Sequence, residues 1–194
     1  MIITYIHIIH DQVFKKLDTI VLIGPIGVGK STQAKLLAEK LDMPRVSYDE
    51  VKGGYWKTLG LSKEKALSIE KEHGEYAMIS YMNEYKSRTV CSIIEDYPGH
   101  VIDFGGGAQT FDEPHQVKMV YDVFEPISNI FLLLPSHDLT TNIKSLPGLK
   151  ENYPINAYLI MHPTNELFAK KTVYTLEKTP LEICNEIIGQ MDVS

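Results

Sequence analysis

Arginine is scarce in this sequence. Only two of the 19 basic residues are arginine, Arg45 and Arg88, and the formal net charge is −6. Proteins that bind nucleic acid in general carry a basic face rich in lysine and arginine. The composition therefore argues against such a protein, and we expect no nucleic-acid partner.

Cysteines and long apolar runs are also few. The two cysteines, Cys91 and Cys184, lie far apart and form no metal-binding pair, so we expect free thiols and a cytoplasmic protein. One apolar run, residues 2–9, is too short to span a bilayer and lacks the features of a signal peptide. We interpret residues 1–18 as an N-terminal appendage without chemistry, either a short helix or strand or a loose end, and expect no membrane partner.

Three glycines occur close together in a loop with a phosphate-binding pattern. Residues 24–31, "GPIGVGKS", match the P-loop pattern G-x-x-x-x-G-K-[ST] in full. A predicted buried strand, 19–23, precedes them and an amphipathic helix, 31–41, follows. Such a loop curls its backbone N–H groups around phosphates, while the lysine reaches the β- and γ-phosphates and the serine holds Mg²⁺. The expected nucleotide-binding positions here are Gly24, Pro25, Ile26, Gly27, Val28, Gly29, Lys30, Ser31 and Thr32.

The rest of the chain alternates short apolar strands with helices. The strands are predicted at 19–23, 44–51, 100–104, 129–134 and 171–176. Between them we expect a loop at 52–60, a helical stretch from 62 to 97 that Gly74 interrupts, and further helices, the last capped by Thr179 and begun by Pro180. This order predicts an α/β protein with the P-loop NTPase fold, three layers (α/β/α) around a five-stranded parallel sheet, over residues 19–194.

Polar residues follow the predicted strands at one edge of the sheet. Ligands of parallel sheets bind at the carboxyl ends of the strands. Asp49 follows the second strand and is the candidate to orient or deprotonate an attacking hydroxyl, although an N-cap role is the alternative. Asp103 ends the third strand and is, with Ser31, the candidate magnesium ligand; a solvated aspartate is the alternative. The next residues, Gly105, Gly106 and Gly107, allow a ligand to approach the backbone closely.

Aromatic residues near Asp49 suggest a wall for the acceptor pocket. Tyr55 and Trp56 are predicted to bind the substrate, with core packing as the alternative. For the isolated histidines His115 and His162 we expect structural or solvated roles, with a place in the pocket as the alternative.

These motifs resemble those of shikimate kinases. The P-loop, "SYDEV", "GE" at residues 74–75 and "VIDFGGG" occur in that family's order and approximate spacing, across about residues 19–190. The resemblance implies ATP and Mg²⁺ as cofactors, a substrate-binding role for Asp49 and the glycine triplet, and an adenine loop containing Thr175, Lys178 and Pro180. Asp103 is closer to the adenylate kinase pattern, in which a strand ends in a magnesium-associated aspartate.

The departures from that family concern the acceptor. Shikimate kinases bind the substrate carboxylate with arginines; here Ile79 stands at the first such position, and "YLIMHPTN" (158–165) offers none. Ser47 replaces the first aspartate of the family's D-x-D motif. The lid region supplies Lys144 and Lys150, and lysine lacks the bidentate fork of arginine.

We therefore predict an ATP-dependent phosphotransferase acting on a hydroxyl of a small molecule, with Lys30 and Asp49 as catalytic residues and shikimate as a poor substrate. A nucleotide kinase and a nucleotide-binding regulatory module with little activity remain the alternatives. We expect a monomer or a small homo-oligomer.

Overall fold

The computed structural model describes residues 19–146 and 154–192. Its centre is a sheet of five strands in the order β2-β3-β1-β4-β5, and every neighbouring pair is parallel. The strands are β1 (Ile20–Ile23), β2 (Arg45–Ser47), β3 (Val101–Asp103), β4 (Asn129–Leu134) and β5 (Lys171–Tyr174). The predicted five-stranded parallel sheet is confirmed.

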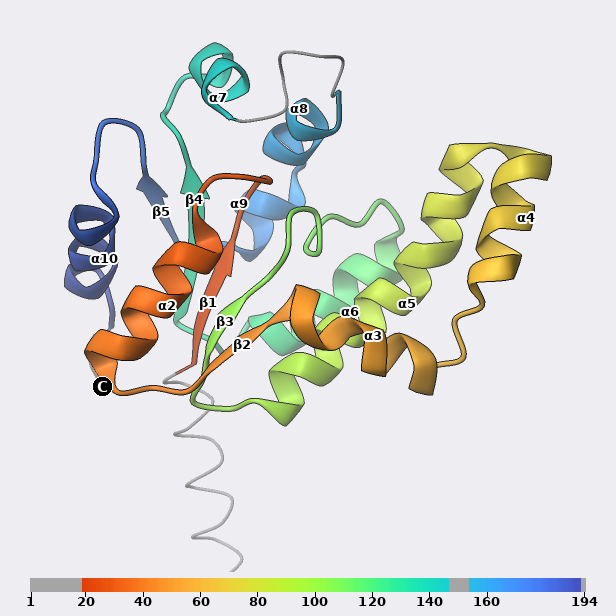
Figure 1. The fold of residues 1–194 in the computed structure, drawn as a ribbon, viewed down its shortest axis with the longest axis horizontal. Helices are drawn as coiled ribbons and strands as arrows, with labels where there is room; N and C mark the ends of the chain where they lie inside the picture. The colour runs from red at the N-terminus through yellow and green to blue at the C-terminus, as the bar shows by residue number, and fades with distance from the viewer. Residues whose placement is uncertain (1–18, 147–153, 193–194) are drawn as a thin grey trace, which may run out of the picture.

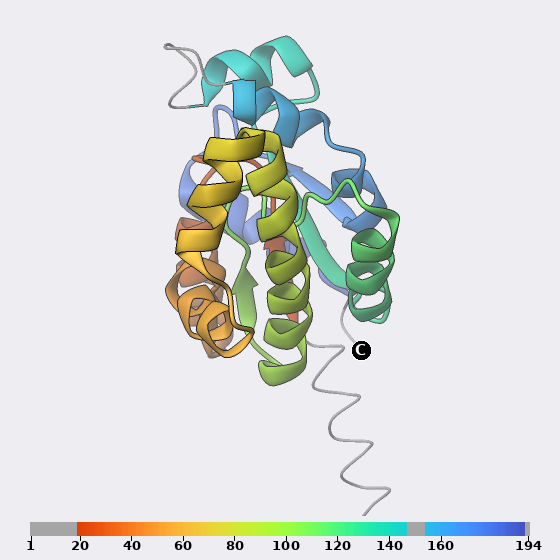
Figure 2. The ribbon, with the colours of Figure 1, turned by 90° about the vertical axis from the view of Figure 1, so that its right-hand side faces the viewer.

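Helices cover both faces of the sheet and extend beyond its carboxyl edge (Figure 1). One face carries α2 (Lys30–Leu41) and α10 (Pro180–Gly189). The other carries α3 (Tyr48–Thr58), α5 (Glu75–Asp96), α6 (Pro114–Phe124) and α9 (Thr164–Phe168). Beyond them lie α4 (Lys63–His73), packed beside α5 (Figure 2), and α7 (Leu139–Ser145) and α8 (Pro154–Met161). This is the predicted three-layer α/β/α architecture.

The strands form because they are apolar on both sides. Alternate residues of β1 belong to different cores: Val21 and Ile23 pack toward α5 and α6, whereas Ile20 and Leu22 pack toward α2 and α10. All four are fully buried. Burial on both faces is typical of the central strand of a parallel sheet. The P-loop begins directly after this buried strand, at Gly24.

The region after β2 differs from the prediction. The second strand ends at Ser47, and residues 48–58 form helix α3, so the expected loop at 52–60 is wrong and Asp49 lies in a helical first turn. Glycine disfavours helices by about 1 kcal/mol relative to alanine. Here Tyr48 and Val51 pack in the core between the sheet and helices α5 and α6, which we call the main core. This packing stabilises the helix despite Gly53 and Gly54.

Other boundaries agree closely with the sequence. Gly74 separates α4 from α5, as predicted. Thr179 caps α10 through a capping box with Glu182, and Pro180 is its first residue. The five-residue helix α9 was not predicted. The N-terminal appendage (1–18) lies outside the described residues, and within the described part of the chain no helix is long and apolar enough to cross a membrane.

Candidate functional site

The P-loop connects β1 to α2 and has the curled backbone that phosphate binding requires. Gly24, Gly27 and Gly29 all have positive φ angles. A side chain on Gly24 would collide with the backbone carbonyl of Leu133 in the neighbouring strand β4. The loop is therefore held against the sheet, and α2 begins immediately after it, with its N-terminal N–H groups facing the loop.

Lys30 lies buried beneath this loop. Its ammonium group donates hydrogen bonds to the carbonyl oxygens of Gly24 at 2.8 Å and Pro25 at 2.7 Å. Burial lowers the pKa of Lys30 to about 8, against the opposing attraction of Asp103 and Asp49. Both candidate carboxylates therefore act electrostatically on the P-loop lysine and favour its charged form.

Asp103 is a buried carboxylate of which only one oxygen accepts a hydrogen bond from the described residues. Ser47 donates its hydroxyl to Oδ1 at 2.5 Å, since the two residues stand opposite each other in the register of β2 and β3. The other oxygen, Oδ2, has no hydrogen-bond partner among the described residues and lies 3.6 Å from the guanidinium of Arg45. An orphaned carboxylate oxygen is a suitable ligand for Mg²⁺, directly or through water.

Ser47, which stands at the place of the first aspartate of the D-x-D motif, lies directly opposite Asp103 on the adjacent strand. An acidic side chain is therefore present at this edge of the sheet, on β3. No group of three or more acidic, histidine or cysteine side chains fit to hold a metal occurs among the described residues.

Asp49 lies exposed in the first turn of α3, where Lys52, one turn later, pairs with its carboxylate. The pair opens onto a cavity of about 610 Å³ between α3 and α4. Its lining residues are Asp49, Glu50, Lys52, Gly53, Trp56, Lys57, Leu61, Lys63 and Glu64. Trp56 therefore stands where the sequence suggested a pocket wall.

Tyr55 lies on the other side of α3. Its ring packs against the main core and its hydroxyl donates to Asp96 at 2.7 Å. Burial is the largest cause raising its pKa, followed by this hydrogen bond. The residue is absent from the lining of this cavity, and its contacts fit the core-packing alternative.

The glycine triplet joins the parts of the site. A Cβ on Gly105 would lie 2.6 Å from the Asp49 carboxylate oxygen Oδ2. A Cβ on Gly106 would collide with the Ile26 side chain and lie 3.0 Å from its backbone nitrogen, and one on Gly107 would lie 2.9 Å from Leu159 of α8. The triplet thus contacts the candidate base, the P-loop and the helix that follows the lid region.

The predicted adenine loop follows β5. Thr175 donates its backbone N–H to Leu134 of β4, and Lys178 pairs its ammonium with Glu186 of α10 at 2.5 Å. Gln33 of the P-loop helix donates to the carbonyl oxygen of Pro180 at 3.0 Å, a link that sequence reasoning missed. The phosphate loop and the expected base-binding loop are therefore tied together.

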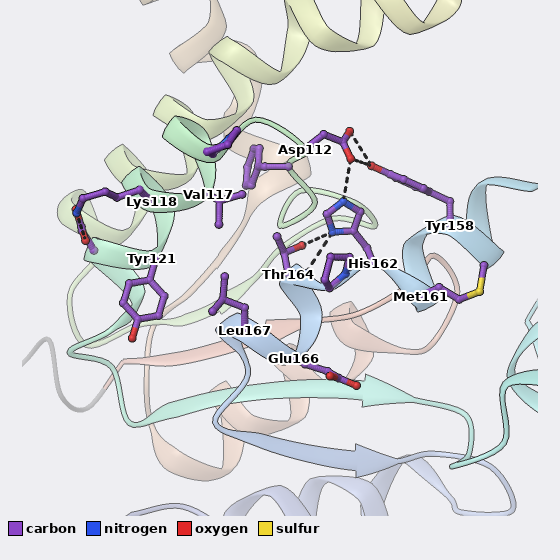
Figure 3. A pocket seen from close by; sticks show the side chains of 14 residues that line it. Asp112, Val117, Lys118, Tyr121, Tyr158, Met161, His162, Thr164, Glu166 and Leu167 are labelled. Atoms are coloured by element: carbon purple, nitrogen blue, oxygen red, sulfur yellow. Dashed lines mark hydrogen bonds and ion pairs between the residues drawn. The ribbon is translucent and has the colours of Figure 1, made fainter.

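A second cavity, of about 1190 Å³, lies between α6, α8 and α9 (Figure 3). At one end Asp112 accepts hydrogen bonds from the Tyr158 hydroxyl, at 3.0 and 3.1 Å, and lies 3.3 Å from Nε2 of the buried His162. The other ring nitrogen of His162 lies 2.6 Å from Oγ1 of Thr164. His162 is thus bonded on both sides, as a structural histidine would be, and exposed His115 pairs with Glu84.

Both arginines are paired with carboxylates. Arg45 binds Glu50 at 3.0 Å and approaches Asp103, whereas Arg88 binds Glu84 at 2.9 Å on α5. Arg45 is the first residue of β2, and its long side chain reaches the end of the neighbouring strand β3. Ile79, which the resemblance matches to an arginine position of shikimate kinases, is exposed on α5. Of the two lysines expected in the lid region, Lys144 is exposed on α7 and Lys150 lies outside the described residues.

Comparison with characterised proteins identifies similar chains. The shikimate kinase of Persephonella marina is 30% identical over 192 residues, covering 89% of this chain and 98% of that protein. The shikimate kinase of Dehalococcoides mccartyi is 35% identical over 109 residues, so the chain spans about half of that relative's length (53%). No family model matches the sequence.

Among solved structures, the crystal structure of shikimate kinase from Bacteroides thetaiotaomicron superposes with a TM-score of 0.58 at 18% identity. The superposition covers 90% of this chain and 98% of that one. At this identity the likeness concerns the fold alone, and it agrees with the three-layer α/β/α architecture described above.

Proposed function

The chain belongs to the shikimate kinase family, and from that premise we propose that it transfers the γ-phosphoryl group of ATP to a hydroxyl of a small molecule other than shikimate. One observation carries the proposal. Asp49 lies against Gly105 while the adjacent Gly106 lies against Ile26 of the P-loop. Phosphoryl transfer needs the acceptor oxygen and the γ-phosphate held in line, and the meeting of Asp49 and the P-loop at this turn supports the proposal.

Each polar residue of the site has a role in such a transfer. The P-loop N–H groups and the Lys30 ammonium would bind the phosphates, and Ser31 and Asp103 would hold Mg²⁺. When bound, Mg²⁺ neutralises charge on the phosphates. Asp49 would orient the acceptor hydroxyl and accept its proton, with Lys52 keeping the carboxylate in place. Most of the rate gain would come from positioning and charge neutralisation.

The acceptor pocket argues against a carboxylate-bearing substrate. A desolvated carboxylate without a cationic partner is costly. Arg45 and Arg88 are both paired with acidic side chains, and Lys52 is paired with Asp49. Lys57 and Lys63 also line the cavity, but lysine lacks the bidentate fork that arginine offers a carboxylate. The same observation weighs against a nucleotide kinase, which needs cations around a second set of phosphates. Rapid transfer to any member of a panel of nucleoside mono- and diphosphates would favour that alternative.

The proposal is tested by measuring ADP release with ATP, Mg²⁺ and a library of hydroxyl-bearing metabolites. We expect Lys30→Ala to lose turnover, and Asp49→Asn to lose at least about a hundredfold in kcat while still binding ATP, because general bases contribute about 10²–10⁴. Asp122→Asn, which removes an exposed carboxylate of α6, is the matched control and should turn over normally.

Two outcomes would contradict the proposal. Turnover in Lys30→Ala equal to that of the unmodified protein would exclude the P-loop as the site of transfer. Equal affinity for ATP and ADP, with no acceptor in the library, would instead favour a regulatory nucleotide-binding module.

A further inference from the structure

Lys86 of α5 supports the loop that contains the glycine triplet. Its ammonium group donates hydrogen bonds to the carbonyl oxygens of Gly107 at 2.9 Å and Thr110 at 2.7 Å. It also lies 4.7 Å from the centre of the Phe111 ring, within the range of a cation–π interaction. One cation thus anchors both ends of the four-residue segment 107–110.

The same segment has its own hydrogen bonds, which depend on a fixed backbone. Ala108 donates its N–H to Gly105 at 2.9 Å, and Thr110 donates its N–H to Gly107 at 3.2 Å. The Thr110 hydroxyl also donates to Gly107 at 2.8 Å. The carbonyl of Gly107 therefore accepts from three donors, of which only the Lys86 ammonium comes from another element and carries a charge.

This segment is continuous with the turn on which Asp49 and the P-loop meet. Gly105 and Gly106 touch those two elements directly, and the glycines have no side chains to hold them there. Charge-assisted hydrogen bonds are about twice as strong as neutral ones. Lys86 supplies two such bonds from a long, packed helix, which is a rigid support.

We propose that Lys86 is a positioning residue for phosphoryl transfer: it holds the glycine turn so that Asp49 and the P-loop keep their relative placement. The role in transfer rests on the proposed function, whereas the hold on the turn does not. Lys86 does not belong to the P-loop motif, the acceptor aspartate or the adenine loop.

The charge of Lys86 gives the proposal a pH dependence. Burial lowers the pKa of Lys86 to about 8, while Asp112, the charged group that opposes this shift, favours the ammonium. Asp112 itself is held by Tyr158 and His162. The hold on the turn should therefore weaken as the pH rises through about 8, when the ammonium loses a proton.

Hydrogen exchange of the segment 105–111, measured by mass spectrometry and corrected for intrinsic rates, tests the hold on the turn. In Lys86→Met the Ala108 and Thr110 amides should exchange at least tenfold faster than in the unmodified protein. Lys118→Met, an exposed lysine of α6, is the control and should leave the segment unchanged. Lys86→Gln provides the same comparison if the methionine variant does not fold.

The pH series and the kinetics separate positioning from general stability. Between pH 7 and pH 9 the segment should lose protection in the unmodified protein but keep it in Lys86→Arg, whose charge persists. With an acceptor from the library, Lys86→Met should lower kcat/KM for that acceptor at least tenfold, with ATP affinity within about threefold. Lys86→Arg should restore most of it.

Unchanged exchange of the segment in Lys86→Met would overturn the proposal, whatever the activity. Faster exchange with unaltered acceptor kinetics would overturn the role in transfer. Failure of the whole library as acceptors would count against the proposed function alone, because the exchange measurement needs no acceptor.

Discussion

Lys30 shows how one residue combines opposing requirements. Phosphate binding needs the ammonium form, and burial disfavours that form, which lowers the pKa of Lys30 to about 8. The free protein therefore retains the charge below pH 8 and loses it above. We expect ATP to bind roughly tenfold more weakly at pH 9 than at pH 7, as a site that requires one group with this pKa to be protonated would.

Fluorescence titration with ATP at half-unit intervals of pH measures this change. The contribution of Lys30 to the free energy of unfolding should instead rise with pH between pH 8 and about 10.5. In that range the unfolded lysine binds a proton that the folded one has lost. These measurements are made in the Lys86→Arg variant, because Lys86 is the other lysine among the described residues whose pKa lies at about 8. A flat affinity profile from pH 7 to 9 would contradict the argument.

Single residues also show where sequence reasoning reached its limit. The P-loop could be found because its glycines and lysine act over eight consecutive positions. The hydrogen bond of Asp103 with Ser47 and its ion pair with Arg45 join positions more than fifty residues apart, and they follow only from the register of β2 and β3. Lys86 gave no signal at all, because an ordinary lysine on a helix becomes a support only through the loop beside it.

At the scale of elements, the strands other than β2 were predicted well because parallel strands buried on both faces are nearly continuous apolar runs. Helix α3 was missed for the opposite reason. Its sequence contains Gly53 and Gly54, and local propensity favours a loop there. The helix forms because tertiary packing of its apolar side overrides propensity, which no single segment reveals.

Helix α3 provides a direct test of that account. A Cβ on Gly54 would meet no atom within 4 Å, and this glycine is helical without a positive φ angle. Gly54→Ala should therefore stabilise the protein by about 0.5–1 kcal/mol, measured as the free energy of urea unfolding. Gly74→Ala is the matched control: its φ of +87° should make the same substitution destabilising. Destabilisation by Gly54→Ala would show that α3 is absent in solution.

At the scale of the whole molecule, the fold could be predicted from the sequence more completely than the acceptor pocket. The three-layer architecture follows from many weak signals that agree, and it is confirmed. The acceptor pocket depends on few side chains: Tyr55 and Trp56 both pack against the core, but only Trp56 also lines the cavity, although the two are adjacent in sequence. Helical periodicity separated them, and the sequence pattern had suggested a loop.

The distribution of positive charge over the molecule leads to the last prediction, that shikimate is a poor acceptor. Its carboxylate would need a cation, and Arg45 and Arg88 are paired with Glu50 and Glu84. Arg88 also lies nine residues beyond Ile79, which is about 13 Å along a helix, too far to replace the missing arginine.

A coupled assay of ADP release with shikimate measures the consequence. We expect kcat/KM below about 10⁴ M⁻¹s⁻¹, the low end for ordinary enzymes. A matched reaction with the same ATP and Mg²⁺ and an acceptor from the metabolite library shows that the protein is active. A higher value for shikimate would mean that a lysine, such as Lys57 or Lys63 beside the Asp49 cavity, neutralises the carboxylate in place of arginine. The acceptor would then be the substrate that the family name implies, and the arginine argument would be wrong.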